Sequence, residues 1–134
     1  MIHDILETRI ATLGLVPGET LFRETFPADV TMGVMVRAPL DGIAIDQNLP
    51  GWHKTQMQVV LRHTDPVEGQ ALAVRIQTAL TLEGRETHAA TAERPAVEMR
   101  LIYPLTLPIR FPRLDGGGLE FSQRFRTVFG VLST

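Results

Sequence analysis

The glycine triplet Gly116 to Gly118, which follows Asp115, is the stretch that most resembles a ligand-binding loop. A Walker-type phosphate loop needs a lysine and a serine or threonine directly after its last glycine, and then a helix whose N-terminus holds the phosphate. Here Leu119 and Glu120 follow, and the next segment alternates like a strand. A dinucleotide-binding fingerprint fails for the same reason. The triplet therefore predicts a flexible hairpin loop between two strands, which suits docking against a neighbouring molecule.

The histidines and cysteines offer no pattern that predicts a metal site. His53 and His63 flank one expected strand, so at about 3.3 Å per residue they lie roughly 30 Å apart. His3 and His88 form no His-x-x-x-His or Glu-x-x-His pair with any other residue. We expect all four to be isolated histidines at the surface or rim. The sequence contains no cysteine, which excludes disulfides, zinc thiolate sites and cysteine nucleophiles.

The hydroxyl and carboxyl groups do not form a recognisable catalytic arrangement either. Ser122 and Ser133 are the only serines, and neither lies in a Gly-x-Ser-x-Gly elbow. Asp41, Asp46 and Asp65 have the chemistry of general acids or bases, but turns and a helix cap explain each of them. The sequence therefore predicts no enzyme and no cofactor.

A basic stripe near the C-terminal end could contact nucleic acid. It consists of four arginines within 17 residues: Arg110, Arg113, Arg124 and Arg126. The alternative is a polar strand face on which these arginines pair with Glu120 and Glu98 of neighbouring strands. The net charge of −2 gives no electrostatic reason to expect a tight nucleic-acid binder.

The length and composition are those of one globular domain. The chain has 134 residues, of which 44% are hydrophobic and 21% charged. We therefore expect a single domain over residues 1–134. Asp4, Glu7 and Arg9 interrupt the N-terminal apolar stretch, which argues against a secretory signal. No apolar run approaches the roughly 20 residues of a membrane span, so we expect a cytosolic protein or part of a particle assembled in the cytosol.

Two helices are expected from the spacing of apolar residues. The first covers residues 2–13, with a stripe of Ile2, Ile5, Leu6, Ile10 and Leu13. In the second, Asp65 or Thr64 is the N-cap and Pro66 occupies the first helical position. Its expected buried stripe consists of Leu72, Ile76 and Leu80 with Ala71 and Ala79. Gly69 costs this helix about 1 kcal/mol relative to alanine.

The alternation of apolar and polar residues predicts the strands of the sheet that the helices cover. The clearest segments are residues 30–38, 53–63, 97–107 and 119–129. Residues 20–27 and 42–46 are weaker strand candidates, and residues 83–96 are a loop or a weak edge strand. On segment 97–107 we expect Met99, Leu101, Tyr103 and Leu105 to share one face, and on the last segment Leu119, Phe121, Phe125 and Phe129.

Together these elements predict an α+β fold, with a mostly antiparallel sheet and two helices packed on one face. Pro104 should mark a sheet edge or a strand end, because proline lacks the amide donor of a ladder. The order of the elements runs helix, strands, helix, strands, and no internal repeat is visible.

Three segments of the sequence resemble sequences of the phage tail-terminator family, whose members are also called tail-completion or minor capsid proteins. They are "GVMVRAPLDG" at the end of a strand, "HKTQMQVVLRHTDPVEGQALAVRIQTAL", and "LPIRFPRLDGGGLEFSQRFRTVF". In the family, an alternating strand ends in a basic residue and is followed by Asp and a helix. A proline-led segment, a glycine-bearing turn and a final strand with alternating aromatics come last. The match runs through most of the chain.

The resemblance implies a structural virion protein. Members resembling this chain form a six-membered ring that caps the tail tube, stops its polymerisation and presents a surface to the head-side connector. The implied partners are further copies of the chain, the tail tube protein, the connector, and genome DNA that passes the lumen without sequence-specific binding. The implied location is the head-proximal end of the tail, after assembly in the host cytoplasm, with no membrane involved. The family has no catalytic residues to transfer.

We expect the subunit and partner contacts to include flexible tips and arginines of the C-terminal region. These candidates are Asp115, Gly116, Gly117, Gly118, Arg110, Arg113, Arg124 and Arg126. The polar segment 83–96 is a further candidate. One alternative function is that of a head-completion or neck adaptor protein. Another is a small α+β enzyme or ligand-binding domain, which needs a concave pocket with convergent polar groups that nothing in the sequence marks.

Overall fold

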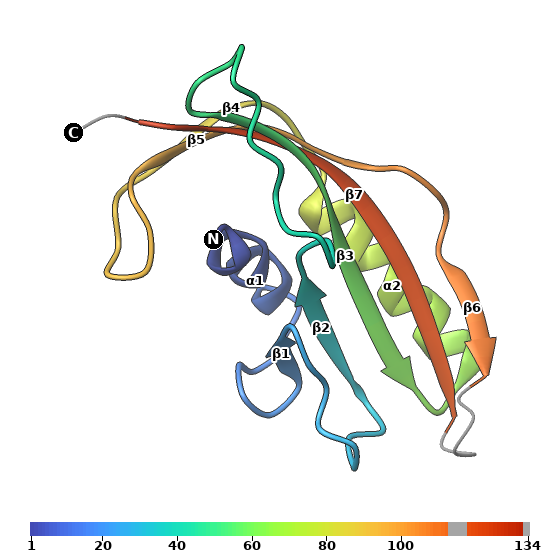
Figure 1. Ribbon diagram of the computed structural model, residues 1–134. Coiled ribbons are helices and arrows are strands. Elements are labelled where there is room, and N and C mark those ends of the chain that lie inside the picture. Colours follow the sequence, from blue (N-terminus) through green and yellow to red (C-terminus); the bar gives the residue numbers. More distant parts are fainter. Residues whose placement is uncertain (113–117, 133–134) are drawn as a thin grey trace.

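The computed structural model describes residues 1–112 and 118–132, which form a seven-stranded sheet and two helices (Figure 1). The helices are α1 (His3–Ala11) and α2 (Pro66–Leu80). The strands are β1 (Leu21–Arg23), β2 (Gly33–Arg37), β3 (Trp52–His63), β4 (Leu82–His88), β5 (Val97–Pro104), β6 (Ile109–Pro112) and β7 (Leu119–Val131). The strand order is β1-β2-β3-β7-β5-β4, and β6 pairs with β7. Among the strand pairings of residues 1–112 and 118–132, β1–β2 is parallel and the others are antiparallel, so the predicted α+β class is confirmed.

Strand β7 lies at the centre of the sheet, and its sequence places large aromatics on one face and polar residues on the other. It pairs with β3 over twelve positions and, on its other side, with β5 and then β6. Phe121, Phe125 and Phe129 are 0% exposed, as the alternation predicts. Fully burying side chains of this size stabilises the fold by about 1.5–3 kcal/mol each.

Both helices pack against the same face of the sheet (Figure 1). Helix α2 contacts β3, β5 and β7, and α1 contacts β1, β2 and α2. The opposite face, here called the open face, carries no helix among the described residues. On β3 and β7 it presents mainly polar residues, paired by register as Gln58 with Arg124 and Gln56 with Arg126.

Helix α2 begins as predicted, and its buried stripe includes the predicted Ile76 and Leu80 but not Ala71. Asp65 is the N-cap, and its Oδ1 accepts a hydrogen bond from the Val67 amide at 2.8 Å. The fully covered positions of the helix are Gly69, Ala73, Ile76 and Leu80. The prediction that Ala71 is buried is wrong, because the stripe passes through positions 69, 73, 76 and 80 and leaves Ala71 exposed.

A β-bulge changes the predicted face of β5. Met99 lies opposite Phe129, but Leu101 lies opposite Val128, so Arg100 is the extra residue. After the bulge the inward position passes to the next residue, which is Ile102. The prediction that Leu101, Tyr103 and Leu105 share one face with Met99 is therefore wrong. Pro104 ends β5, as expected for a residue without a ladder donor.

The weaker strand predictions had mixed outcomes. Segment 42–46 is not a strand but part of a loop. The N-terminal half of segment 83–96 forms the edge strand β4, and the remainder is irregular. Pairing of β6 with the start of β7, with Pro112 opposite Leu119, confirms the two strands of the predicted hairpin.

Two histidines are buried, which corrects the prediction that all four lie at the surface or rim. His3 and His63 are 8% and 7% exposed. His3 Nε2 lies 2.6 Å from a carboxylate oxygen of Glu24, and His63 Nδ1 accepts a hydrogen bond from the Asp65 amide at 2.9 Å. Within residues 1–112 and 118–132, no three acidic, histidine or cysteine side chains cluster as metal ligands would. Neither described helix is long and apolar enough to cross a membrane.

A buried arginine ties α1 to the segment before β5. Arg94 is 7% exposed and donates to both carboxylate oxygens of Asp4, with Nη2 to Oδ2 at 2.9 Å. Its Nη1 also donates to the carbonyls of Ala89 and Pro95. Burial by itself raises the pKa of Asp4, but the hydrogen bonds and charge of Arg94 outweigh it. The pKa of this carboxyl group therefore lies below its ordinary value of 3.8.

We expect Asp4→Asn to lower the free energy of unfolding by about 1–3 kcal/mol near neutral pH, because Arg94 loses a charged acceptor. A carboxyl group with a depressed folded pKa contributes stability above its unfolded pKa and loses it as the pH falls through the folded pKa. The difference between the parent and Asp4→Asn should therefore shrink as the pH falls below about 4. Urea unfolding across pH measures it. Asp29→Asn, at an exposed loop position, is the control for the loss of one carboxylate and should change the free energy of unfolding by less than about 0.5 kcal/mol near neutral pH.

Candidate subunit interface

An exposed apolar ribbon follows one margin of the sheet from β5 to β6. It consists of Tyr103, Leu105, Leu107, Ile109 and Phe111, which alternate along the chain and are 37–77% exposed. Tyr103, Ile109 and Phe111 lie opposite Arg126, Ser122 and Glu120, so this ribbon belongs to the open face. Exposed apolar residues that gather in this way mark surfaces that other molecules cover.

Three prolines limit how the ribbon can be covered. Pro104, Pro108 and Pro112 alternate with its apolar residues and lack amide donors. The side of β7 next to this segment is already occupied, since the Leu105 amide donates to the Arg124 carbonyl at 2.9 Å and β6 pairs with β7. A partner would therefore meet the apolar side chains rather than extend the sheet by regular strand addition.

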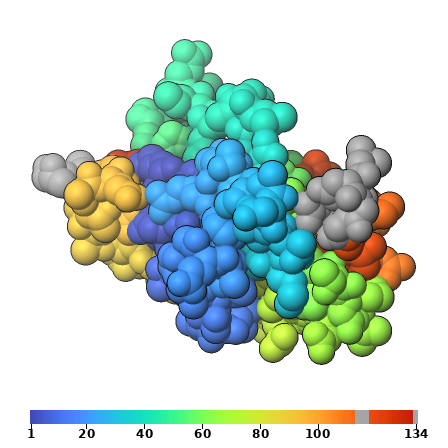
Figure 2. All heavy atoms as spheres, turned by 90° about the horizontal axis from the view of Figure 1, so that it is seen from below, coloured from blue at the N-terminus to red at the C-terminus, as the bar shows by residue number. Residues whose placement is uncertain are grey.

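A second apolar surface lies on the loop that joins β2 to β3, residues 38–51. Leu40 is 92% exposed and Ile45 is 85% exposed. In Figure 2 this loop, coloured cyan to teal, projects at the top, away from α2 in yellow-green at the bottom. The loop also carries two carboxylates, Asp41 and Asp46. The loop therefore combines exposed apolar side chains with carboxylates, whereas the residues that form the ribbon are apolar.

The centre of the open face is basic. Arg37 is half-buried, while Lys54, Arg124 and Arg126 are exposed. Among the described residues none of the four forms a close ion pair with a carboxylate, although the charge of Arg37 helps to lower the pKa of Glu24. The alternative prediction that Arg124 and Arg126 pair with Glu120 and Glu98 is wrong, because other arginines occupy those carboxylates.

Those carboxylates are held by arginines that the sequence prediction did not consider. Arg62 Nε lies 2.8 Å from Glu120. Arg85 and Arg100 both pair with Glu98, at 2.8 and 3.2 Å. Arg124 and Arg126 are therefore left available to a molecule outside the chain.

The remaining predicted contact residues are only partly within the described chain. Arg110 is exposed on β6 and lies opposite the buried Phe121. Gly118 has φ of +97°, and a Cβ there would lie 2.9 Å from the His63 carbonyl oxygen, so a glycine is required. Arg113, Asp115, Gly116 and Gly117 lie outside the described residues, and their role in contacts stays a prediction.

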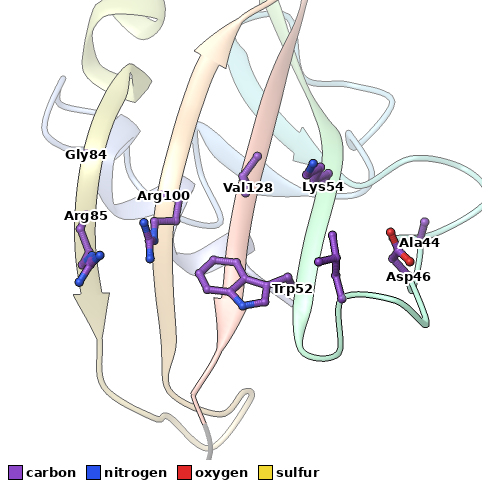
Figure 3. A pocket seen from close by; sticks show the side chains of 9 residues that line it. Ala44, Asp46, Trp52, Lys54, Gly84, Arg85, Arg100 and Val128 are labelled. Atoms are coloured by element: carbon purple, nitrogen blue, oxygen red, sulfur yellow. The ribbon is translucent and has the colours of Figure 1, made fainter.

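A pocket of about 850 Å³ opens on the open face beside the 38–51 loop (Figure 3). Trp52 and Lys54 come from β3, Val128 from β7, Arg100 from β5 and Arg85 from β4. The Arg100 guanidinium lies 5.1 Å from the centre of the Trp52 ring. Ala44, Asp46 and Leu49 of the loop form one wall of this pocket. The sequence did not indicate the pocket, because it does not show where this loop lies relative to the strands.

The pocket lining does not resemble an active site. Its polar groups are three cations and Asp46, and two of the cations already pair with Glu98. The described lining residues include no histidine or serine that could act as a base or nucleophile. The arrangement suits contact with a complementary surface.

Taken together, the fold and the surface define an α+β protein with one helix-covered face and one basic open face bordered by apolar elements. The family model for bacteriophage tail terminator proteins matches residues 9–129, and the chain belongs to that family. It is a family of structural phage-tail proteins and not of enzymes. The family resemblance expected from the sequence is thereby confirmed.

Comparison with solved structures confirms the fold. The virion of native gene transfer agent (GTA) particle contains a chain that aligns with a TM-score of 0.51 and 13% identity. The alignment covers 90% of this chain and 84% of the other. At this identity the likeness shows the fold alone. No curated protein matches the chain in sequence.

Proposed function

We propose that this protein, acting as one domain over residues 1–134, forms a hexameric ring that caps the phage tail tube. The ring ends tube polymerisation at the head-proximal end of the tail, joins the tail to the head-side connector, and leaves a lumen for genome DNA. The observation that carries the proposal is membership of the tail-terminator family over residues 9–129. The resemblance to the family supports the ring, its six-fold symmetry and the connector joint, and the two exposed apolar surfaces described above further support a ring.

Two different apolar surfaces support a ring. A heterologous contact joins one patch of a subunit to a different patch of the next, and it closes when the rotation between subunits closes. The ribbon provides one patch through Leu107 and Phe111. The 38–51 loop provides the other through Leu40 and Ile45, which are 92% and 85% exposed. We therefore propose that the ribbon of one subunit contacts the loop of the next.

Removing the protein from the phage should produce tail tubes that are too long, because nothing then stops addition of tube subunits. Electron microscopy of particles from a host that supplies no copy of the protein measures the tube lengths. Supplying the wild-type chain from a plasmid should restore one uniform length. Tubes of normal length in its absence would rule out a terminating role. Tubes of normal length that do not join heads would instead identify a neck adaptor.

A further inference from the structure

The cations of the open face that form no close ion pair are arranged in rows across the sheet. Arg37 lies opposite Gln58, and Gln58 lies opposite Arg124, so the two arginines flank one amide side chain. Arg126 lies in the next row, opposite Gln56, and Lys54 follows two residues further along β3. The chain as a whole carries a net charge of −2, so this concentration of positive charge is local.

The first row surrounds a hollow of about 240 Å³. Its polar lining consists of Arg37, Arg124, Gln56 and Gln58, and the start of the 38–51 loop forms one wall. Gln58 is held in place because its Nε2 donates to Ser122 Oγ at 2.9 Å. Two guanidinium groups that face one hollow match a group with several acceptor oxygens and a negative charge, and phosphate is the best example.

The cations beyond the hollow point to a chain of phosphates rather than to a single one. Arg124 and Arg126 are two residues apart on one strand, about 7 Å. Arg126 and Lys54 do not line the hollow, so a linear molecule with a phosphate at each step would engage all four cations, which a phosphate seated between Arg37 and Arg124 does less well. The backbone of a nucleic acid has this form, and its phosphates are recognised without regard to sequence.

We propose that the open face binds the phosphodiester backbone of nucleic acid through Arg37, Arg124, Arg126 and Lys54, without sequence preference. The proposal does not depend on the formation of a ring, because it is argued only from the cations and the hollow of the open face. It favours the nucleic-acid alternative that the sequence left open for Arg124 and Arg126, although the net charge of −2 gave no reason to expect a tight nucleic-acid binder.

The test measures binding of the full-length protein to a fluorescently labelled DNA duplex of mixed sequence by anisotropy at low salt. Parent protein should bind, and affinity should fall steeply with salt as counterions re-associate with DNA. Arg37→Gln, Arg124→Gln and Arg126→Gln combined should weaken binding about tenfold or more. The same triple variant should lower the salt slope by about 1 for each arginine that no longer neutralises a phosphate. A second duplex of different sequence should bind equally well.

Arg75→Gln is the matched control, because Arg75 is exposed on α2 and its loss changes the net charge as much as Arg124→Gln does. It should bind DNA like the parent, whereas Arg124→Gln should bind several-fold more weakly. Arg124→Lys keeps the charge and should recover part of the affinity. Circular dichroism of each variant checks the fold, and size-exclusion chromatography records the assembly state separately.

Three results would overturn the proposal. One is parent protein that does not bind DNA at low salt. Another is an equal loss of affinity in Arg75→Gln and Arg124→Gln, which would show an effect of overall charge. The third is displacement of DNA by poly-glutamate at the same charge concentration as by unlabelled DNA. That result would assign the face to an acidic protein surface.

Discussion

Gly69→Val is expected to lower the free energy of unfolding by about 2–4 kcal/mol, although valine is the better helix former. A Cβ at position 69 would lie 2.5 Å from Phe121 Cε1 and 3.1 Å from His63 Cβ. Phe121 is 0% exposed within the core, so its ring has little room to move. The glycine therefore allows α2 to approach β7 closely. Urea unfolding at a fixed protein concentration measures the loss.

Ala71→Val is the control for the helix itself. Ala71 is exposed on α2, so valine there should cost less than about 1 kcal/mol. The contact with Phe121 is tested by combining Gly69→Ala with Phe121→Leu. A shorter side chain makes space, so the double variant should lose less stability than the sum of the single losses. If Gly69→Val is as stable as the parent, the close approach of α2 to β7 is refuted.

Gly69 illustrates what the sequence could and could not provide. Propensity alone identified it as a cost to the helix, and only the three-dimensional contact with Phe121 gives the reason for its presence. The elements with strong local signals were predicted well, such as the capped start of α2 and the alternation of aromatics on β7. Local signals also led to the mostly antiparallel sheet, because every long segment alternated.

The errors arose where a non-local effect decided the outcome. Because of the bulge at Arg100, Ile102 and not Leu101 is the next residue of β5 to face the core. An alternating sequence does not reveal that one strand contains an extra residue. His3 is buried because Glu24, far away in sequence, supplies a partner at 2.6 Å. The ion pairs at Glu98 and Glu120 were also misassigned, since register between strands decides which arginine reaches each carboxylate.

The candidate interface was predicted only in part. The sequence directed attention to the arginines and glycines near the C-terminus, and Arg124 and Arg126 do lie exposed on the open face. The apolar ribbon was missed, although its signal is present in the alternation of residues 103–111. The sequence predicted only that residues of this segment share a face and that Pro104 marks an edge or a strand end, because alternation does not show whether a face is covered.

Replacing Leu107 and Phe111 together by aspartate is expected to prevent ring assembly while leaving the subunit folded. Both side chains are exposed, at 77% and 40%, so the single subunit loses little stability. In an assembled ring, the same substitutions would bury two unpaired charges, which costs several kcal/mol at each contact. Multi-angle light scattering should find monomers where the parent forms a ring. Thr78→Asp, on the exposed side of α2, is the control and should assemble normally.

Mixing two defective subunits distinguishes a heterologous ring from other assemblies. A loop variant, Leu40→Asp with Ile45→Asp, should also be monomeric alone. Each variant keeps one intact surface, so the ribbon of the loop variant can bind the loop of the ribbon variant. The mixture should therefore form a one-to-one heterodimer and nothing larger, because both remaining surfaces are defective. If the loop variant dimerises alone, the ribbon contacts its own copy, and a ring closed by ribbon–loop contacts is excluded.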